Sequence, residues 1–153
     1  MKVKTKFGEV EILDDKVIRF DEGLPGFENL RDFAIISNGT EPVMWLVSLE
    51  DENVALPVIN PWLVRIDYSV DIPDYVKEDL GIENPEDVQI WAILVIPPDN
   101  PEDMTINLLA PIVINLKTNR GKQIILENEE YGIRHKVREE LERSKRLAEV
   151  NAG

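Results

Sequence analysis

The sequence predicts a mainly β protein, an antiparallel barrel that is partly open or closed, with one short helix and a C-terminal helix. About nine short apolar runs are separated by turn signals such as Asn38-Gly39, a pattern typical of barrels and sandwiches. Residues 104–126 alternate in polarity over an unusual length. Only two segments have the spacing or the end signals of a helix. Alternation alone does not distinguish a barrel from a sandwich.

The first 66 residues contain most of the predicted strands. Lysines alternate with Val3, Thr5 and Phe7, and residues 9–13 and 17–20 continue the meander. We expect further strands at 33–37, 44–49, 54–59 and 63–66. Pro57 indicates a bulge or a free edge, because proline has no N–H for a sheet ladder.

A short helix and a central strand follow. The helix is expected near residues 73–80, with a proline in its first turn and Gly81 after its last apolar residue. Val76 and Leu80 would cap one end of the barrel. Residues 88–96 are apolar on both alternating faces, which predicts a central strand covered on both sides over much of its length.

Residues 104–126 predict a long strand and its return. The even positions from Ile106 to Leu116 are all apolar and the odd ones are mixed, which predicts one buried and one half-exposed face. Pro111 should mark a bulge, a bend or a free edge in that strand. Gly121 supplies the positive φ that a bulged hairpin needs, and residues 123–126 return.

The chain divides into a barrel domain at 1–128 and a charged C-terminal helix or tail at 129–153. The helix should begin near Glu129, with a thin apolar stripe at Ile133, Val137, Leu141 and Ala148. Such a stripe gains little by packing on the barrel, so partial fraying is expected.

The charge is strongly acidic, at −13 for 30 acidic and 17 basic residues. The segment 129–153 is neutral, so the excess, 24 acids against 11 bases, lies in residues 1–128. This field repels phosphate backbones, which argues against direct nucleic-acid binding, and attracts basic proteins. The absence of cysteine, of a signal-peptide pattern and of any stretch able to span a bilayer predicts a cytoplasmic protein with no membrane contact.

No catalytic constellation is evident in the sequence. His135 is the only histidine, so neither a histidine-based zinc site nor a serine protease triad is supported, and we expect it to be solvated. No phosphate-binding glycine motif is present. Acidic pairs arise by chance among 30 acids. The sequence therefore predicts a protein that is not an enzyme and has no metal or cofactor.

Three stretches resemble the FliW family of flagellar assembly factors. They are Gly23–Glu28 (GLPGFE), the run from Ser48 to Pro61 that leads on to Asp67-Tyr68, and Asn107–Asn115 with Gly121, Gln123 and Tyr131 after it. The resemblance implies a non-enzymatic regulator that binds newly made flagellin. It also implies antagonism of CsrA, a small dimeric RNA-binding repressor that blocks flagellin translation.

Two sets of residues are predicted to bind these partners. For flagellin they are Leu24, Pro25 and Phe27, beside an edge made available by Pro57 or Pro111. Phe27 has the alternative interpretation of a core anchor. For CsrA they are acids near the helix and where the tail leaves the barrel: Asp71, Asp74, Glu78, Asp79, Glu127, Glu129 and Glu130. These acids have the alternative role of keeping the barrel soluble.

A different class of function remains open from sequence alone. A small β-barrel can bind a flavin or another small molecule in its mouth, and Trp45, Trp62 and Trp91 would line such a pocket. Core packing explains the same three side chains more simply.

Overall fold

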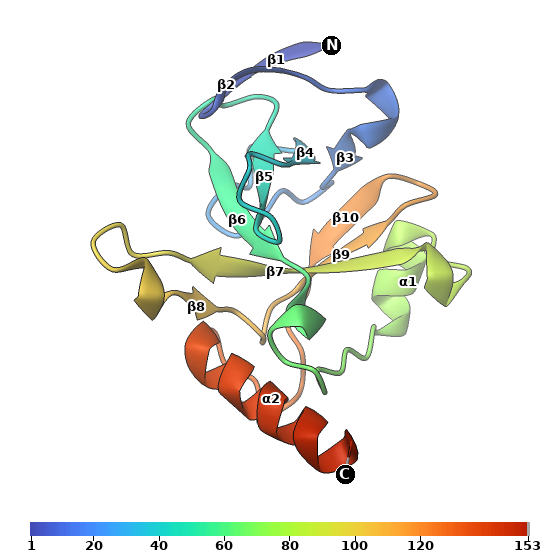
Figure 1. Ribbon diagram of the computed structural model, residues 1–153. Coiled ribbons are helices and arrows are strands. Elements are labelled where there is room, and N and C mark those ends of the chain that lie inside the picture. Colours follow the sequence, from blue (N-terminus) through green and yellow to red (C-terminus); the bar gives the residue numbers. More distant parts are fainter. Residues whose placement is uncertain (153) are drawn as a thin grey trace.

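A closed ring of seven strands forms the centre of the protein in the computed structural model, which describes residues 1–152 (Figure 1). The strands are β3 (Ile18–Arg19), β4 (Asp32–Ile36), β5 (Met44–Ser48), β6 (Ala55–Ile59), β7 (Val88–Val95), β9 (Ile112–Asn115) and β10 (Arg120–Gln123). They pair in the order β7-β6-β5-β4-β3-β10-β9, and β9 returns to β7. The predicted mainly β fold is confirmed, and the barrel rather than the sandwich is formed.

The seam of the ring is short. Strands β3 and β10 pair in parallel through one residue pair, Arg19 with Arg120, whereas the other strand pairings of the described chain are antiparallel. Arg19 also lies 3.2 Å from the Asp32 carboxylate, and Arg120 lies 2.5 Å from that of Asp21. The Arg19–Asp32 pair joins β3 to β4, whereas the Arg120–Asp21 pair crosses the seam and adds a side-chain contact to its single backbone pairing.

The remaining elements lie outside the ring. A hairpin of β1 (Lys2–Thr5) and β2 (Gly8–Glu11) covers one end, at the top of Figure 1. Strands β8 (Thr105–Ile106) and β11 (His135–Lys136) extend the sheet beside β7. The helices are α1 (Asp74–Leu80), beside β9 and β10, and α2 (Val137–Ala152), at the bottom. Single 3₁₀ turns occur at Asp14–Lys16, Pro61–Leu63, Pro85–Asp87 and Pro101–Asp103.

Alternation along the strands builds three apolar clusters. Inward residues such as Phe33, Leu46 and Ile112 fill the barrel. Outward residues of β4 and β5 pack under the N-terminal hairpin. Outward residues of β7 and β9 pack with the segments around both helices, where Val76 and Leu80 are buried as predicted. Strand β7 lies between two clusters, which confirms that it is covered on both faces over most of its length.

The predicted long strand at 104–126 is broken. Both β8 and β9 pair with β7, and the Asn107 N–H still donates to the Ile93 carbonyl of β7, but residues 108–111 leave the ladder between them. The Asn107 side chain accepts hydrogen bonds from the N–H groups of Leu109 and Ala110, and Pro111 has no N–H to offer. A break at Pro111 was expected. The prediction of one half-exposed face was wrong for β9. All four of its residues are buried, because an outer apolar cluster covers Val113.

The C-terminal helix begins later than predicted. Residues 129–134 lie outside helix and strand, and His135 and Lys136 pair with β8, so α2 starts at Val137 rather than at Glu129. The predicted stripe is also wrong, since Ile133 and Leu141 are exposed. The division of the chain at residue 128 stays a prediction.

Candidate protein-binding surface

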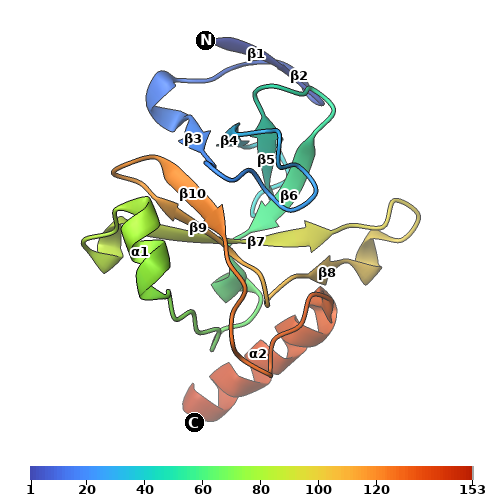
Figure 2. The ribbon, with the colours of Figure 1, turned by 180° about the vertical axis from the view of Figure 1, so that it is seen from behind.

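A groove separates the approach to α1 from the chain that leaves β10. One wall contains Ser69, Asp71, Ile72, Pro73 and Tyr75, and the other contains Ile125, Leu126, Glu127 and Asn128. Its cavity volume is about 470 Å³. Figure 2 shows the chain after β10 running past the barrel toward α2. The structure thus brings together Asp71 and Glu127, two acids that sequence reasoning assigned to one surface from positions far apart in the chain.

Local sequence explains why this wall is held in place. Pro73 precedes the helix in an extended conformation, and its carbonyl accepts the N–H groups of Val76 and Lys77. Gly81 ends α1 in the left-handed region, with φ of 66°, which glycine adopts without a Cβ clash. The side chains of the buried Asn115 and the exposed Thr118 both donate to the Leu80 carbonyl. The C-terminal end of the helix is therefore fixed against β9 and the turn that follows it.

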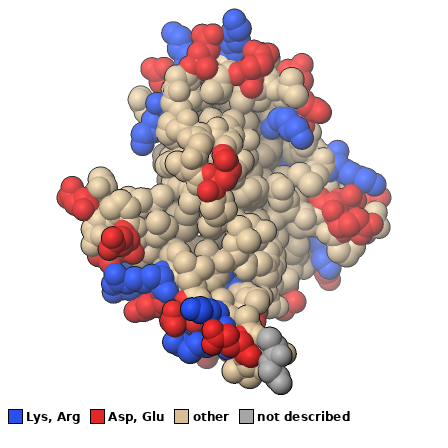
Figure 3. Space-filling view, viewed as in Figure 1, with Lys and Arg blue, Asp and Glu red and all other residues tan. Residues whose placement is uncertain are grey.

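The seven predicted acids are all exposed, but they differ in their partners. Asp79 lies 3.0 Å from Lys122, and Glu130 lies 3.1 Å from Arg65. Asp74 has a loose contact of 3.9 Å with Lys77. Within residues 1–152 the other four, Asp71, Glu78, Glu127 and Glu129, form no ion pair. In Figure 3 acidic side chains gather on the side where α1 lies, whereas both signs alternate along α2.

Two large apolar side chains are exposed at the groove. Ile125 is 74% and Tyr75 58% accessible to solvent. Neither lysine nor arginine lines the groove. Exposed apolar side chains next to carboxylates are typical of protein interfaces, and the negative charge favours a basic partner.

The GLPGFE stretch forms a rigid turn. Pro25 and Gly26 are its central residues, the Phe27 N–H donates to the Leu24 carbonyl at 2.7 Å, and Gly26 has φ of 86°. The backbone N–H groups of Glu28 itself and of Gly26 point at the Glu28 carboxylate and hold its pKa below the usual range. Pro25 is exposed, Phe27 is half-buried against the barrel interior, and Leu24 is 1% exposed. In this conformation only Pro25 and part of Phe27 are accessible to a partner.

A second cavity, of about 350 Å³, links this turn to α1. It is lined by the residues before Leu24 and by Glu78, Asp79 and Lys122. The Lys122 ammonium lies 3.2 Å from Glu22 and 3.0 Å from Asp79, and 5.5 Å from the centre of the Tyr75 ring. These hydrogen bonds raise the pKa of Lys122 despite its partial burial. The two predicted binding regions are therefore neighbours on one side of the protein.

The expected free edges differ in position. Pro57 pairs with Trp45 of β5, and β6 meets β7 only at Val58 and Ile59, so its edge is free before those residues. Pro111 lies instead within the break between β8 and β9, and its carbonyl accepts the N–H of Ile124.

Sequence reasoning missed a buried polar network beneath α2. Arg65 is 6% exposed, and its guanidinium lies 3.4 Å from Glu140, 3.1 Å from Glu130 and 5.0 Å from the centre of the Tyr131 ring. The other Glu140 oxygen lies 3.0 Å from His135 Nδ1. His135 Nε2 accepts the Gly132 N–H at 2.7 Å, which assigns the ring proton to Nδ1. The expectation of a solvated His135 was wrong.

The middle of α2 is held by polar contacts to residues 64–67. Arg143 binds both oxygens of Asp67, at 2.6 and 2.7 Å, which holds the pKa of Asp67 below its usual range and raises that of Arg143. The Ser144 hydroxyl donates to the Val64 carbonyl and accepts the Ile66 N–H. The helix is therefore docked, contrary to the frayed helix expected from its apolar residues.

Comparison with known proteins identifies the same family as the three sequence stretches. The family model described as FliW protein matches residues 2–137. The flagellar assembly factor FliW of Thermosipho africanus is 52% identical over 140 residues, which cover 91% of this chain and 97% of that protein. The FliW of Pseudothermotoga lettingae is 53% identical over 147 residues, covering 96% and 94%.

The chain belongs to the FliW family.

A solved FliW structure has the same fold. The crystal structure of the flagellar assembly factor FliW matches with a TM-score of 0.82 and 33% identity, over 90% of this chain and 96% of that one. The family model ends at residue 137, where α2 begins, so the residues of α2 that contact Arg65 and Asp67 lie outside it. The predicted resemblance to FliW is confirmed.

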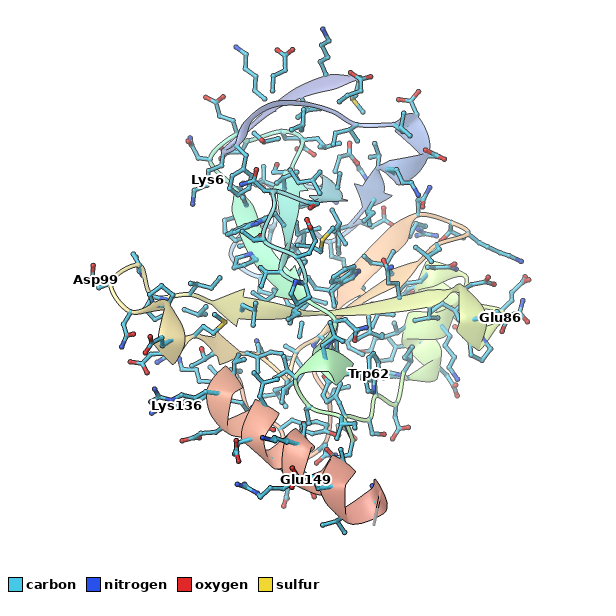
Figure 4. All side chains as sticks on the ribbon, viewed as in Figure 1. Lys6, Trp62, Glu86, Asp99, Lys136 and Glu149 are labelled. Atoms are coloured by element: carbon cyan, nitrogen blue, oxygen red, sulfur yellow. The ribbon has the colours of Figure 1, made fainter. Side chains whose placement is uncertain are left out.

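The three tryptophans of this FliW-family chain do not share a pocket. Trp45 packs against Phe7 under the hairpin, and Trp91 lies in the barrel cluster. Trp62 lies on the α2 side of β7 and contacts Tyr68 (Figure 4). The flavin-binding alternative therefore loses its proposed lining. Among residues 1–152 no helix has the length and apolar character of a membrane span, and no group of three or more potential metal ligands occurs.

Proposed function

We propose that this FliW-family protein is a cytoplasmic, non-enzymatic regulator of flagellar assembly that binds flagellin and antagonises the translational repressor CsrA. The observation that supports this most directly is the groove of Asp71, Tyr75, Ile125 and Glu127, in which exposed apolar side chains are bordered by unpaired carboxylates. The function of the FliW relatives supplies the context, and the groove supplies a surface that suits a basic protein.

The charge distribution supports contact with CsrA itself rather than with its RNA. An RNA-binding surface must present lysine and arginine to phosphate groups, and the net charge of this chain is −13. The carboxylates that give this chain its negative charge attract the basic surface of an RNA-binding repressor and raise the rate at which the two proteins associate. Because that attraction decays over a Debye length of roughly 8 Å at physiological salt, the rate should depend steeply on ionic strength.

The GLPGFE turn is proposed to contact flagellin. A binding protein for a segment that is disordered before assembly has to offer an apolar contact or a free strand edge. Pro25 and the exposed part of Phe27 offer an apolar contact, on a turn that is closed by the hydrogen bond from the Phe27 N–H to the Leu24 carbonyl. The residues that lead into this turn, Asp21 to Gly23, line the same cavity as Glu78 and Asp79 of α1. Two proteins bound at these neighbouring regions would compete for space, which would couple flagellin binding to release of CsrA.

The experiment for CsrA is a salt series of association rates. The test variant changes Glu127, Glu129 and Glu130 to Gln. A control of equal net charge changes the exposed residues Glu41, Glu52 and Glu102 to Gln. We expect the rate to fall steeply with salt for the wild type and the control, and a slower rate with a shallower slope for the test variant. A flat salt dependence of the wild type would refute the electrostatic account.

The experiment for flagellin uses Phe27→Ala with Trp62→Ala as an aromatic control on another face. We expect Phe27→Ala to weaken flagellin binding while the melting temperature stays nearly unchanged. If the variant unfolds instead, the side chain is a core anchor and the proposal for this residue fails.

A further inference from the structure

A strand edge next to the groove is unpaired. The N–H groups of Ile124 and Leu126 donate to carbonyls of the 107–111 segment at 3.0 and 2.8 Å. Along an extended strand, successive backbone groups point to opposite edges. The N–H and C=O of Ile125 and the N–H of Glu127 therefore point away from this ladder. Within the described chain they have no hydrogen-bond partner.

The short seam of the barrel explains why this edge is open. Strand β3 meets β10 at Arg120 only, so no strand continues beside residues 124–127. Ile125 and Glu127 instead line the groove, and the opposite wall, which includes Asp71 and Tyr75, leaves a cavity of about 470 Å³ between them. Sheet edges of this kind are templates for pairing with another chain.

The chemistry around the edge selects the incoming chain. The groove is lined by the carboxylates of Asp71 and Glu127 and by no basic residue, and Glu129 follows unpaired. A lysine-bearing or arginine-bearing segment complements this charge. Ile125, at 74% exposure, offers an apolar neighbour for a β-branched or aromatic cross-strand residue.

We propose that an extended, basic segment of a partner protein adds as a strand to the edge at Ile125–Glu127. Backbone hydrogen bonds supply the register. Ile125 and Glu127 are two residues apart and so share one face of the strand, where they meet an apolar and a basic side chain that are likewise two residues apart in the incoming segment. This inference deepens the proposed function, because it rests on the acidic groove being the surface where a protein partner binds, and it specifies how the partner is held.

The test uses the nonapeptide VVKKVVKKV, acetylated and amidated at its ends, in which each face of the strand carries valine and lysine in turn. At low salt we expect it to bind the full chain and to slow amide hydrogen exchange at Ile125 and Glu127. The matched probe has the same sequence with N-methylated valines, which keeps the charge and side chains but removes the amide donors of those residues. We expect its binding to be weaker by about tenfold or more, because several backbone hydrogen bonds are lost together.

A pair of variants tests the same edge from the protein side. Ile125→Pro removes the edge N–H and leaves the donors of the 107–111 ladder in place, whereas Ile125→Thr keeps that N–H. We expect the proline variant to lose most peptide binding and the threonine variant to keep most of it, at similar melting temperatures. Equal binding of both peptides, exchange unchanged at the two amides, or no binding of either peptide would overturn strand addition.

CsrA binding separates this inference from the proposed function. If the lysine–valine peptide protects the edge but CsrA does not bind the chain, the proposed function fails and the edge site stands. If CsrA binds the wild type without slowing exchange at Ile125 and Glu127, and binds the Ile125→Pro variant equally well, the proposed function stands and strand addition of CsrA is refuted.

Discussion

Removing the Glu140 carboxylate should destabilise the protein more than any exposed change on α2. Glu140 is 8% exposed and lies 3.4 Å from Arg65 and 3.0 Å from His135. Breaking a buried ion pair by deleting one partner costs roughly 3–5 kcal/mol, because the other charge stays buried. Arg65 keeps Glu130 at 3.1 Å and Asp67 at 3.5 Å, so we expect Glu140→Ala to lie at the lower end of that range.

For a chain of this length each kcal/mol lost from the free energy of unfolding lowers the melting temperature by about 2–4 °C. A loss of about 3 kcal/mol therefore predicts a fall in melting temperature of about 6–12 °C. Urea unfolding and a thermal scan measure both quantities. The control is Glu139→Ala, an exposed neighbour on the same helix that should stay within about 0.5 kcal/mol of the wild type. A double change of Arg65→Met and Glu140→Leu should recover most of the loss, since it leaves no unpaired buried arginine. A loss below about 1 kcal/mol for Glu140→Ala would refute this account of α2 docking.

Three further predictions follow from the packing and the pKa shifts. Ile112→Ala, at a side chain 1% exposed inside the barrel, should cost roughly 2–5 kcal/mol in chemical unfolding, and a melting temperature near that of wild type would contradict the assigned face. Gly23→Ala should lower the melting temperature far more than Gly26→Ala, because a Cβ at residue 23 would lie 2.7 Å from backbone atoms whereas a Cβ at residue 26 would face open space. Both glycines have positive φ, so the comparison isolates the clash. Equal melting temperatures of the two variants would show that the clash is relieved. Arg143 lowers the folded-state pKa of Asp67, so the ion pair stabilises the protein fully above the unfolded pKa of about 3.9, and this stabilisation is lost as the pH falls through the folded pKa. Asp67→Asn should therefore make the free energy of unfolding less dependent on pH in that acidic window. An unchanged pH profile would contradict the coupling.

Periodicity predicted the elements whose stability comes from apolar burial. Strand β7 and helix α1 were found because their buried residues follow a period of two or because their ends carry proline and glycine. The same reasoning failed at residues 108–111, where the alternation continues through Leu108 although the backbone leaves the ladder. Hydrogen bonds donated by the N–H groups of Leu109 and Ala110 to the Asn107 side chain decide that local conformation, and apolar alternation contains no sign of them.

The docking of α2 was hidden for a different reason. Its inward face includes Glu140, Arg143 and Ser144, which a hydrophobic pattern scores as a solvent face. The spacing of these three from Val137 does follow one side of a helix, but their partners at residues 64–67 lie more than 70 positions earlier. Pairing at that separation requires the tertiary structure. The acidic residues Asp71 and Glu127 were singled out from the sequence, because charge counts do not depend on long-range pairing, and their role in binding stays a prediction. The exposed apolar side chains of Tyr75 and Ile125 beside them were not singled out.

The one-pair seam between β3 and β10 also determines when the barrel can be completed during synthesis. Arg19 leaves the ribosome about a hundred residues before its partner Arg120. Strands β4 to β6 join by short antiparallel turns and can pair as they emerge, but the ring has to wait for the C-terminal third of the chain. Until then β3 has an unpaired edge beside a sheet that already exposes the apolar side chains of the barrel interior. A nascent chain of this protein is therefore most prone to aggregation between the synthesis of β7 and that of β10, and a truncation before residue 120 should yield an open, association-prone sheet rather than a smaller barrel.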